Sequence, residues 1–205
     1  MVEKLPTQFR KSPEISVNFS FEDIASGLGV IQFWGCASED DGGNDYHLVS
    51  NQTVYSQPPA TRRTGTGTTT IDFDTSPFNY SRTPKGTAHF SANMGTDTNT
   101  ETVKVLVQLK HLAADGTTET NISSEITSQT YTNGGGGVED EVVFLPLPIT
   151  TNKVIKNGES LRMTVKLTTN GSGNNSVGHD PKDATYVGLD TTRVMTLLMP
   201  FNLPI

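Results

Sequence analysis

The chain has 205 residues, of which 33% are hydrophobic, and it carries a formal net charge of -7. This length suits one large domain better than two small ones, and the dispersed lysines and arginines form no basic patch, so we expect no nucleic-acid partner. No apolar run approaches the length that crosses a bilayer, and the N-terminus lacks the features of a signal peptide, so we expect a soluble protein with no membrane contact.

Two features of the composition favour an all-β protein without disulfides. The chain contains about thirty threonines, and β-branched side chains fit a pleated sheet better than a helix. The single cysteine, Cys36, lies near Trp34 in an apolar run. It cannot form an internal disulfide, and we expect it to be a small buried side chain.

The N-terminal region is predicted to be an extended arm. Residues 1–14 contain two prolines and few apolar side chains, so they cannot pack as an independent element. Leu5 and Phe9 are the two side chains that could anchor this arm in the groove of a neighbour. Residues 15–205 are then expected to form a single domain.

The first half of that domain shows the alternation of apolar and polar side chains that is typical of strands. This pattern predicts strands at 15–21, 30–36 and 47–55. The hydrophilic stretch 38–45 is expected to be a loop. The polar, glycine-punctuated stretch 60–70 is also expected to be a loop, and one of this length is usually functional or mobile.

The middle of the chain continues with short strands and turn signals. The strand at 141–147 should lie at a sheet edge, because Pro146 and Pro148 cannot donate ladder hydrogen bonds. The segment 114–116 is a turn signal that should join its two flanking strands as a hairpin. The predicted strands of this region are 71–73, 87–92, 102–112, 117–131 and 141–147.

The C-terminal region carries the clearest pattern. Leu161, Met163, Val165 and Leu167 alternate with polar residues, which predicts a strand with one buried face. Asn157-Gly158 supplies the tight turn before it. The last strand, 193–201, has apolar residues on both faces. Together the elements predict an all-β fold, an antiparallel β-sandwich of jelly-roll type with about ten short strands and no substantial helix.

The order LPIT, KVIKNGESLRMTVKLT, a His-Asp-Pro segment and a terminal LLMPFNL occupies roughly residues 140–205. This order resembles trimeric jelly-roll virion structural proteins, namely the head decoration, cement and fibre proteins of tailed viruses. The resemblance implies a homotrimer in the virion, with other capsid or tail proteins as partners and an N-terminal arm used for docking.

The double-sided last strand agrees with a subunit interface, although burial in the protein's own core explains it equally well. The candidate interface residues are Leu5, Phe9, Met195, Leu197, Met199 and Phe201.

Residues with possible chemistry do not form a recognisable motif. The four histidines share no metal-ligand spacing. The acidic stretch with Glu39, Asp40, Asp41 and Asp45 departs from a calcium loop and is expected to be solvated, and His179, Asp180 and Asp183 are expected to build a turn. We therefore expect no catalytic residue, no cofactor and no metal site.

The leading hypothesis is a non-enzymatic virion structural protein. The alternative is a carbohydrate-binding β-sandwich module or a viral receptor-binding tip, for which a clustered exposed aromatic set would be needed. A third class, a β-sandwich hydrolase, would need a pair of carboxylates that converge in a groove. The aromatic candidates for a sugar platform are Trp34, Tyr46, Tyr55, Tyr80, Tyr131 and Tyr186.

Overall fold

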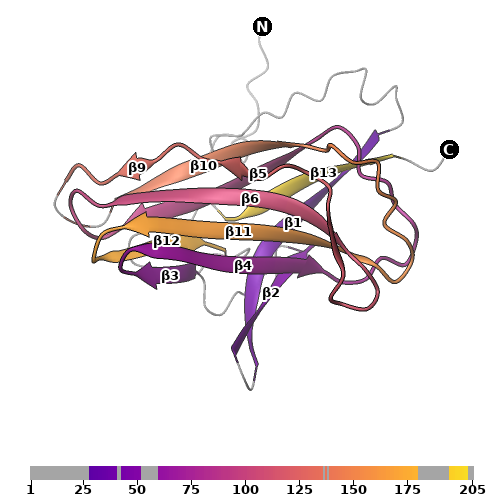
Figure 1. The fold of residues 1–205 in the computed structure, drawn as a ribbon, viewed down its shortest axis with the longest axis horizontal. Helices are drawn as coiled ribbons and strands as arrows, with labels where there is room; N and C mark the ends of the chain where they lie inside the picture. Colours follow the sequence, from indigo (N-terminus) through magenta and orange to yellow (C-terminus); the bar gives the residue numbers. More distant parts are fainter. Residues whose placement is uncertain are drawn as a thin grey trace, which may run out of the picture.

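The computed structural model describes residues 28–40, 43–51, 60–135, 137, 139–179 and 194–202. These residues form strands and connecting turns, and no helix occurs among them (Figure 1). A helix that could cross a membrane is accordingly absent from the described part of the chain.

Thirteen strands are found in these ranges, and they form one continuous hydrogen-bonded sheet that folds into two layers (Figure 1). The first layer contains, in spatial order, β1 (Leu28–Asp40), β13 (Thr196–Asn202), β5 (Thr87–Thr96) and β10 (Glu139–Pro148). The second layer contains β4 (Gly67–Thr75), β11 (Ser160–Asn170) and β6 (Thr102–Leu112), followed by the short strands β7 (Glu119–Asn121), β8 (Ile126–Thr127) and β9 (Tyr131–Thr132).

Three further strands connect or extend these layers. Strand β2 (Gly43–Val49) pairs antiparallel with β1 and parallel with β4, so it joins the two layers along one side. Strands β3 (Ala60–Thr64) and β12 (Asn174–Gly178) pair with each other, and β12 also pairs with the end of β5.

The structure confirms the predicted all-β sandwich, but the sheet is mixed and not purely antiparallel, because β2 and β4 run parallel. The first and last described strands, β1 and β13, are antiparallel neighbours in one layer, while β4, β11 and β6 run antiparallel in the other. Chain segments therefore alternate between the layers, as in a double-sheet jelly roll. The strand count exceeds the expected ten, partly because the predicted strand 117–131 is broken into β7, β8 and β9, which all pair with β6.

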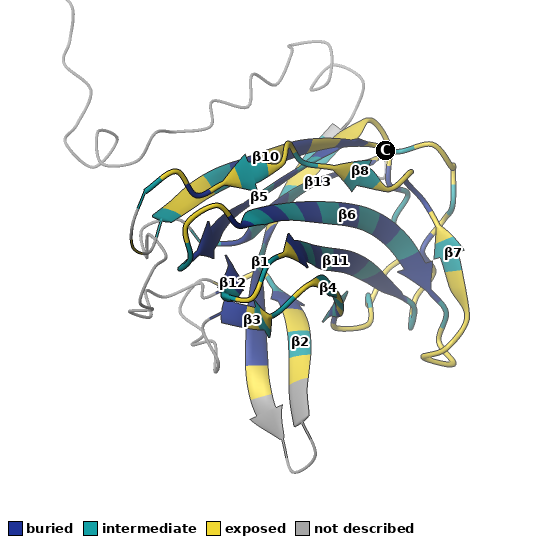
Figure 2. Ribbon diagram, turned by 60° about the vertical axis from the view of Figure 1, so that its left-hand side comes forward, coloured by how far each residue is buried: buried dark blue, intermediate teal, exposed yellow. Residues whose placement is uncertain are grey.

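The core lies between the two layers and follows the predicted alternation. Along β11, inward side chains are buried while Arg162, Lys166 and Thr168 are only half-buried (Figure 2). Side chains that are less than 2% exposed come from both layers. The largest of them are Phe73, Phe90, Phe201, Leu109, Ile122, Leu147, Ile155, Leu161, Met163, Leu167, Met195 and Leu197.

The burial of Met195 and of the inward side chains of β13 corrects the predicted interface. The side chains of Met195, Leu197, Met199 and Phe201 are at most 1% exposed in the single chain. A side chain with no exposed surface cannot contact a second subunit, so these four are core residues. Leu5 and Phe9, the other candidates, lie outside the described residues, as do the arm 1–14 and the predicted strand 15–21.

Two predicted loops were wrong. Residues 60–64 and 67–70 belong to β3 and β4, because the alternating threonines of this stretch pair across to β12 and β11. Most of 38–45 belongs to the β1–β2 hairpin, which projects beyond the two layers (Figure 1). In both cases cross-strand hydrogen bonding stabilises a polar segment that has little to bury.

Several local predictions were confirmed. Gly158 has φ +83° in the turn before β11. Strand β10, with Pro146 and Pro148, pairs with β5 and with no other described strand. Cys36 is buried, at 2% exposed.

Candidate functional site

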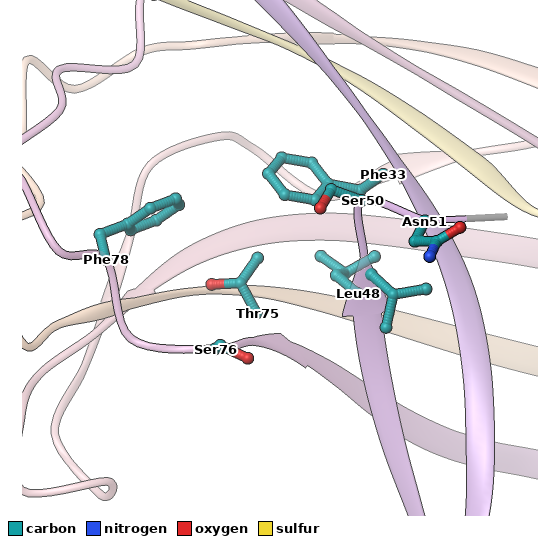
Figure 3. A pocket seen from close by; sticks show the side chains of 8 residues that line it. Phe33, Leu48, Ser50, Asn51, Thr75, Ser76 and Phe78 are labelled. Atoms are coloured by element: carbon teal, nitrogen blue, oxygen red, sulfur yellow. The ribbon is translucent and has the colours of Figure 1, made fainter. Parts of the chain in front are cut away.

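A pocket opens where β2 and β4 end side by side, and we call it the strand-end pocket (Figure 3). The two strands are parallel, with Leu48 opposite Thr75. The segments that follow them therefore leave the sheet at the same edge. The pocket has a volume of about 350 Å³ and is lined by Phe33, Leu48, Val49, Ser50, Asn51, Thr75, Ser76 and Phe78.

The floor of the strand-end pocket is apolar and rigidly held. Phe33 on β1 and Leu48 on β2 belong to the main hydrophobic core. The rings of Phe33 and Phe78 extend toward each other from opposite sides, with Thr75 between them (Figure 3). Phe78 packs edge-on against Phe201, with ring centroids 5.9 Å apart, and the Arg82 guanidinium lies 5.6 Å from its ring centroid. These contacts position the Phe78 ring before any ligand is bound.

The rim of the pocket is polar but carries no charge. Ser50, Asn51 and Ser76 are exposed, and Thr75 is almost completely buried. The Thr75 hydroxyl oxygen accepts a hydrogen bond from the Leu161 backbone N–H at 3.1 Å, which leaves its own proton to be donated. None of the eight lining residues is ionisable, so the pocket offers hydroxyls, one amide and apolar surface only.

A second feature is the outer face of the first layer. Some outward positions of its strands hold apolar side chains, although outward positions are normally polar. Cross-strand register places Phe144, Ser91, Thr196 and Trp34 in one row across β10, β5, β13 and β1. The next row contains Pro146, His89, Leu198 and Gln32. Phe144 is 42% exposed, and Val30, further along β1, is 37% exposed. We call Val30, Trp34, His89, Phe144 and Leu198 the apolar outer face.

His89 is the one ionisable group of the apolar outer face. Its ring stacks on Phe144, with centroids 5.4 Å apart and planes at 13°. Burial lowers the pKa of His89 below its ordinary value, because the charged imidazolium is poorly solvated there. The imidazole therefore contributes mainly ring surface to this face near neutral pH.

The outer face of the second layer is polar and internally paired. Arg162 contacts both carboxylate oxygens of Asp74 and also lies 2.5 Å from Glu119. These carboxylates raise the pKa of Arg162, and the Lys110 hydrogen bond holds the pKa of Glu119 below its usual range. Lys166 pairs with Glu125. Arg162, Lys110 and Lys166 are thus each paired with carboxylates, which is typical of a structural network.

The structure separates the residues that carried possible chemistry. His47 contacts Ser38, His111 pairs with Glu159 at 2.8 Å, and His179 lies in the interior. The described residues hold no group of three or more histidine, cysteine or carboxylate side chains that could bind a metal ion. Asp180 and Asp183 lie outside the described residues, and so do Asp41 and the side chains of Glu39 and Asp40.

His179 was expected in a turn, and it is instead part of a buried aromatic group. Its ring packs edge-on against Tyr46 and Phe73, each with centroids 5.6 Å away, and its Nε2 lies 2.9 Å from the Thr61 hydroxyl. Burial lowers the pKa of His179 to about 4. The side chain is therefore neutral at pH 7 and stabilises the junction between β2, β3 and β4.

Sequence reasoning did not find the strand-end pocket. The aromatic candidates in the sequence were Trp34 and the tyrosines, whereas the pocket is lined by two phenylalanines. Phe33 looks like any inward strand residue, and Phe78 follows a strand in a Pro-containing connection. Only the parallel pairing of β2 with β4 brings them together, and no local signal predicts that pairing.

No protein family model matches the chain, and no curated protein is similar to it. Several solved structures are similar to the chain at low identity. A CocE/NonD family hydrolase from Staphylococcus aureus is 10% identical over 82% of this chain, with a TM-score of 0.43. Carbohydrate-binding modules of the β-sandwich superfamily are 12% identical over 84%, with a TM-score of 0.35. A protein of infectious bursal disease virus, Gx strain, is 13% identical over 86%, with a TM-score of 0.32.

This chain spans 41%, 60% and 36% of the length of those three proteins, respectively. The similar structures thus include a hydrolase, β-sandwich modules and a viral protein. At such low identity and TM-score, these similarities assign neither a family nor a function to this chain.

Proposed function

We propose that this chain is a non-enzymatic structural protein of a virus particle that assembles through its apolar outer face. The observation that carries the proposal is the exposure of Phe144 and Val30, with Leu198 and Trp34 half-buried between them, on a sheet face that would otherwise be polar. The sequence resemblance of residues 140–205 to virion jelly rolls supports the class of protein. Exposed apolar side chains on one sheet face favour an interaction site there.

The occupant of this face is a second copy of the chain, and the assembly is a trimer. Two copies that each carry a net charge of -7 repel one another, so self-association needs a contact without charge. The apolar outer face has such a composition, since His89 is its only ionisable member. The interface thus uses the outward residues of β13, such as Leu198, in place of the core residues that the sequence suggested.

Oligomeric mass measured by light scattering tests this proposal. The wild type should have about three times the single-chain mass of 22.1 kDa, in low and in high salt alike, because apolar contacts are not screened. Phe144→Asp should give single chains with unchanged circular dichroism, because an exposed position tolerates a charge in the free chain but not in an interface.

Thr70→Asp is the matched control, because Thr70 is exposed on a strand of the opposite layer. It should leave the trimer intact. A single-chain mass for the wild type at micromolar concentration would contradict the trimer. Neighbouring genes that encode capsid or tail proteins would support the virion class, and genes of another kind would count against it.

The alternative from the sequence, a carbohydrate-binding module or a receptor-binding tip, is favoured by one specific observation, the strand-end pocket. The two functions are compatible, because the pocket and the apolar outer face involve different residues. A binding site for sugar on a particle protein would make it a receptor-binding component in addition to a structural one.

A further inference from the structure

We propose that the strand-end pocket binds one ring of a neutral saccharide. The inference does not depend on the virion assignment, because it uses only the residues that line the pocket. Four of these residues are apolar and four carry a hydroxyl or an amide, and none is charged. This composition matches a ligand that has both an apolar face and many hydroxyl groups.

Other ligand classes fit less well. An anionic or cationic ligand would lose its hydration without meeting a counter-charge, which is costly. A purely apolar ligand would displace the water that hydrogen-bonds to Thr75 and the rim hydroxyls. It would offer no hydrogen bonds in return, and unpaired polar groups are costly as well. A neutral sugar ring avoids both costs, because its hydroxyls can pair with the rim.

The two phenylalanine rings provide the apolar contact. Phe33 and Phe78 flank the space above Thr75 (Figure 3), so the C–H face of a sugar ring can lie against aromatic surface there. Phe201 and Arg82 already hold the Phe78 ring in place. Ligand binding therefore costs little conformational entropy at Phe78, in contrast to binding against a mobile side chain.

The polar groups provide orientation. Thr75 can donate its hydroxyl proton into the pocket, because its oxygen already accepts from Leu161. Ser50 and Ser76 carry hydroxyls at the exposed rim, and a hydroxyl can both donate and accept. These groups approach from the two segments that follow β2 and β4, so they surround the ring from different directions.

The size of the pocket limits the ligand to about one ring. Its volume of about 350 Å³ lies at the small end of the range of roughly 300–1,000 Å³ for ligand sites. A longer saccharide would extend beyond the rim with its remaining units in solvent. Affinity for a single ring should accordingly be weak, with a Kd on the order of 1 mM.

The test is saturation-transfer NMR and titration calorimetry on the full chain, with maltose, lactose, cellobiose and N,N′-diacetylchitobiose as neutral probes and glucuronic acid as a charged comparator. We expect at least one neutral probe to bind and the charged comparator not to bind. Ser76→Ala, at an exposed rim position that should not affect folding, should weaken binding at least tenfold, and Phe78→Ala should abolish it.

Tyr80→Ala is the matched control for Phe78→Ala. Tyr80 is an aromatic residue two positions along the chain that is 78% exposed and does not line the pocket. It should leave the affinity unchanged. The proposal is overturned if no neutral probe binds, if glucuronic acid binds as well as the neutral probes, or if Tyr80→Ala weakens binding while Ser76→Ala does not.

Discussion

Arg162 and Asp74 form a two-point ion pair between β11 and β4, with Nε 2.6 Å from Oδ1 and Nη2 2.5 Å from Oδ2. The same guanidinium reaches Glu119 at 2.5 Å, next to β6. One side chain thus links β11 with its neighbour β4 and, across β6, with Glu119 of β7. Its planar, forked geometry makes this possible, and a lysine could not reproduce it.

Arg162→Lys should therefore lower the free energy of unfolding by about 1 kcal/mol, a modest value because the pair is partly exposed to solvent. Lys104→Arg on β6 is the reverse exchange on the same outer face, at a side chain with no ion pair to any described residue. It should change stability by less than about 0.5 kcal/mol. Urea denaturation measures both, and equal effects would show that the ion pair contributes nothing.

Met163→Ala should destabilise the fold by roughly 2–5 kcal/mol, because Met163 is fully buried in the core and its truncation leaves a cavity. Thr70→Ala, at an exposed position of the adjacent strand β4, should stay within about 0.5 kcal/mol. Thr164 is not a suitable control, because it is 2% exposed and donates to Asp72 at 2.6 Å. Similar losses for Met163→Ala and Thr70→Ala would mean that the strand register is wrong.

His179 should make stability depend on pH between about 6.5 and 4. The buried imidazole has its pKa lowered to about 4, so in this window the unfolded chain binds a proton that the folded chain does not. Stability should then fall as the pH decreases, by roughly 3 kcal/mol over the whole window.

His179→Gln should remove that contribution and flatten the pH profile of the unfolding free energy between pH 6.5 and 4. The other groups with lowered pKa values, such as His89 and Glu159, are present in both proteins, so the difference between the two profiles isolates His179. Parallel profiles for the wild type and the variant would contradict the neutral, buried state of this histidine.

Thr100→Gly should raise the free energy of unfolding by about 0.5–1 kcal/mol. Thr100 has φ +67°, a left-handed conformation that is unfavourable for a β-branched residue and accessible to glycine. Thr130→Gly, at an exposed position without positive φ, should instead lower stability by about 0.5–1 kcal/mol. Thermal unfolding of the two variants checks the opposite signs, and a loss in both would show that the turn does not strain Thr100.

The sequence by itself determined the features that depend on neighbouring residues in the chain. The alternation from Leu161 to Leu167 predicted which side of β11 is buried, because successive side chains of a strand point to opposite faces. Gly158 predicted its turn, and Pro146 and Pro148 predicted an edge strand, for equally local reasons. These signals together were sufficient to predict a jelly-roll sandwich.

Only the tertiary structure decided which strands are neighbours, and the candidate sites depend on that. The alternation in β13 separates Leu197 from Leu198, but it does not say which of them faces the core when both are apolar. Phe33 and Phe78 are 45 positions apart, and the parallel pairing of β2 with β4 brings them to one pocket. Hydrogen bonds between distant segments set these relationships, and any backbone can form such bonds, so the residues themselves carry no local record of them.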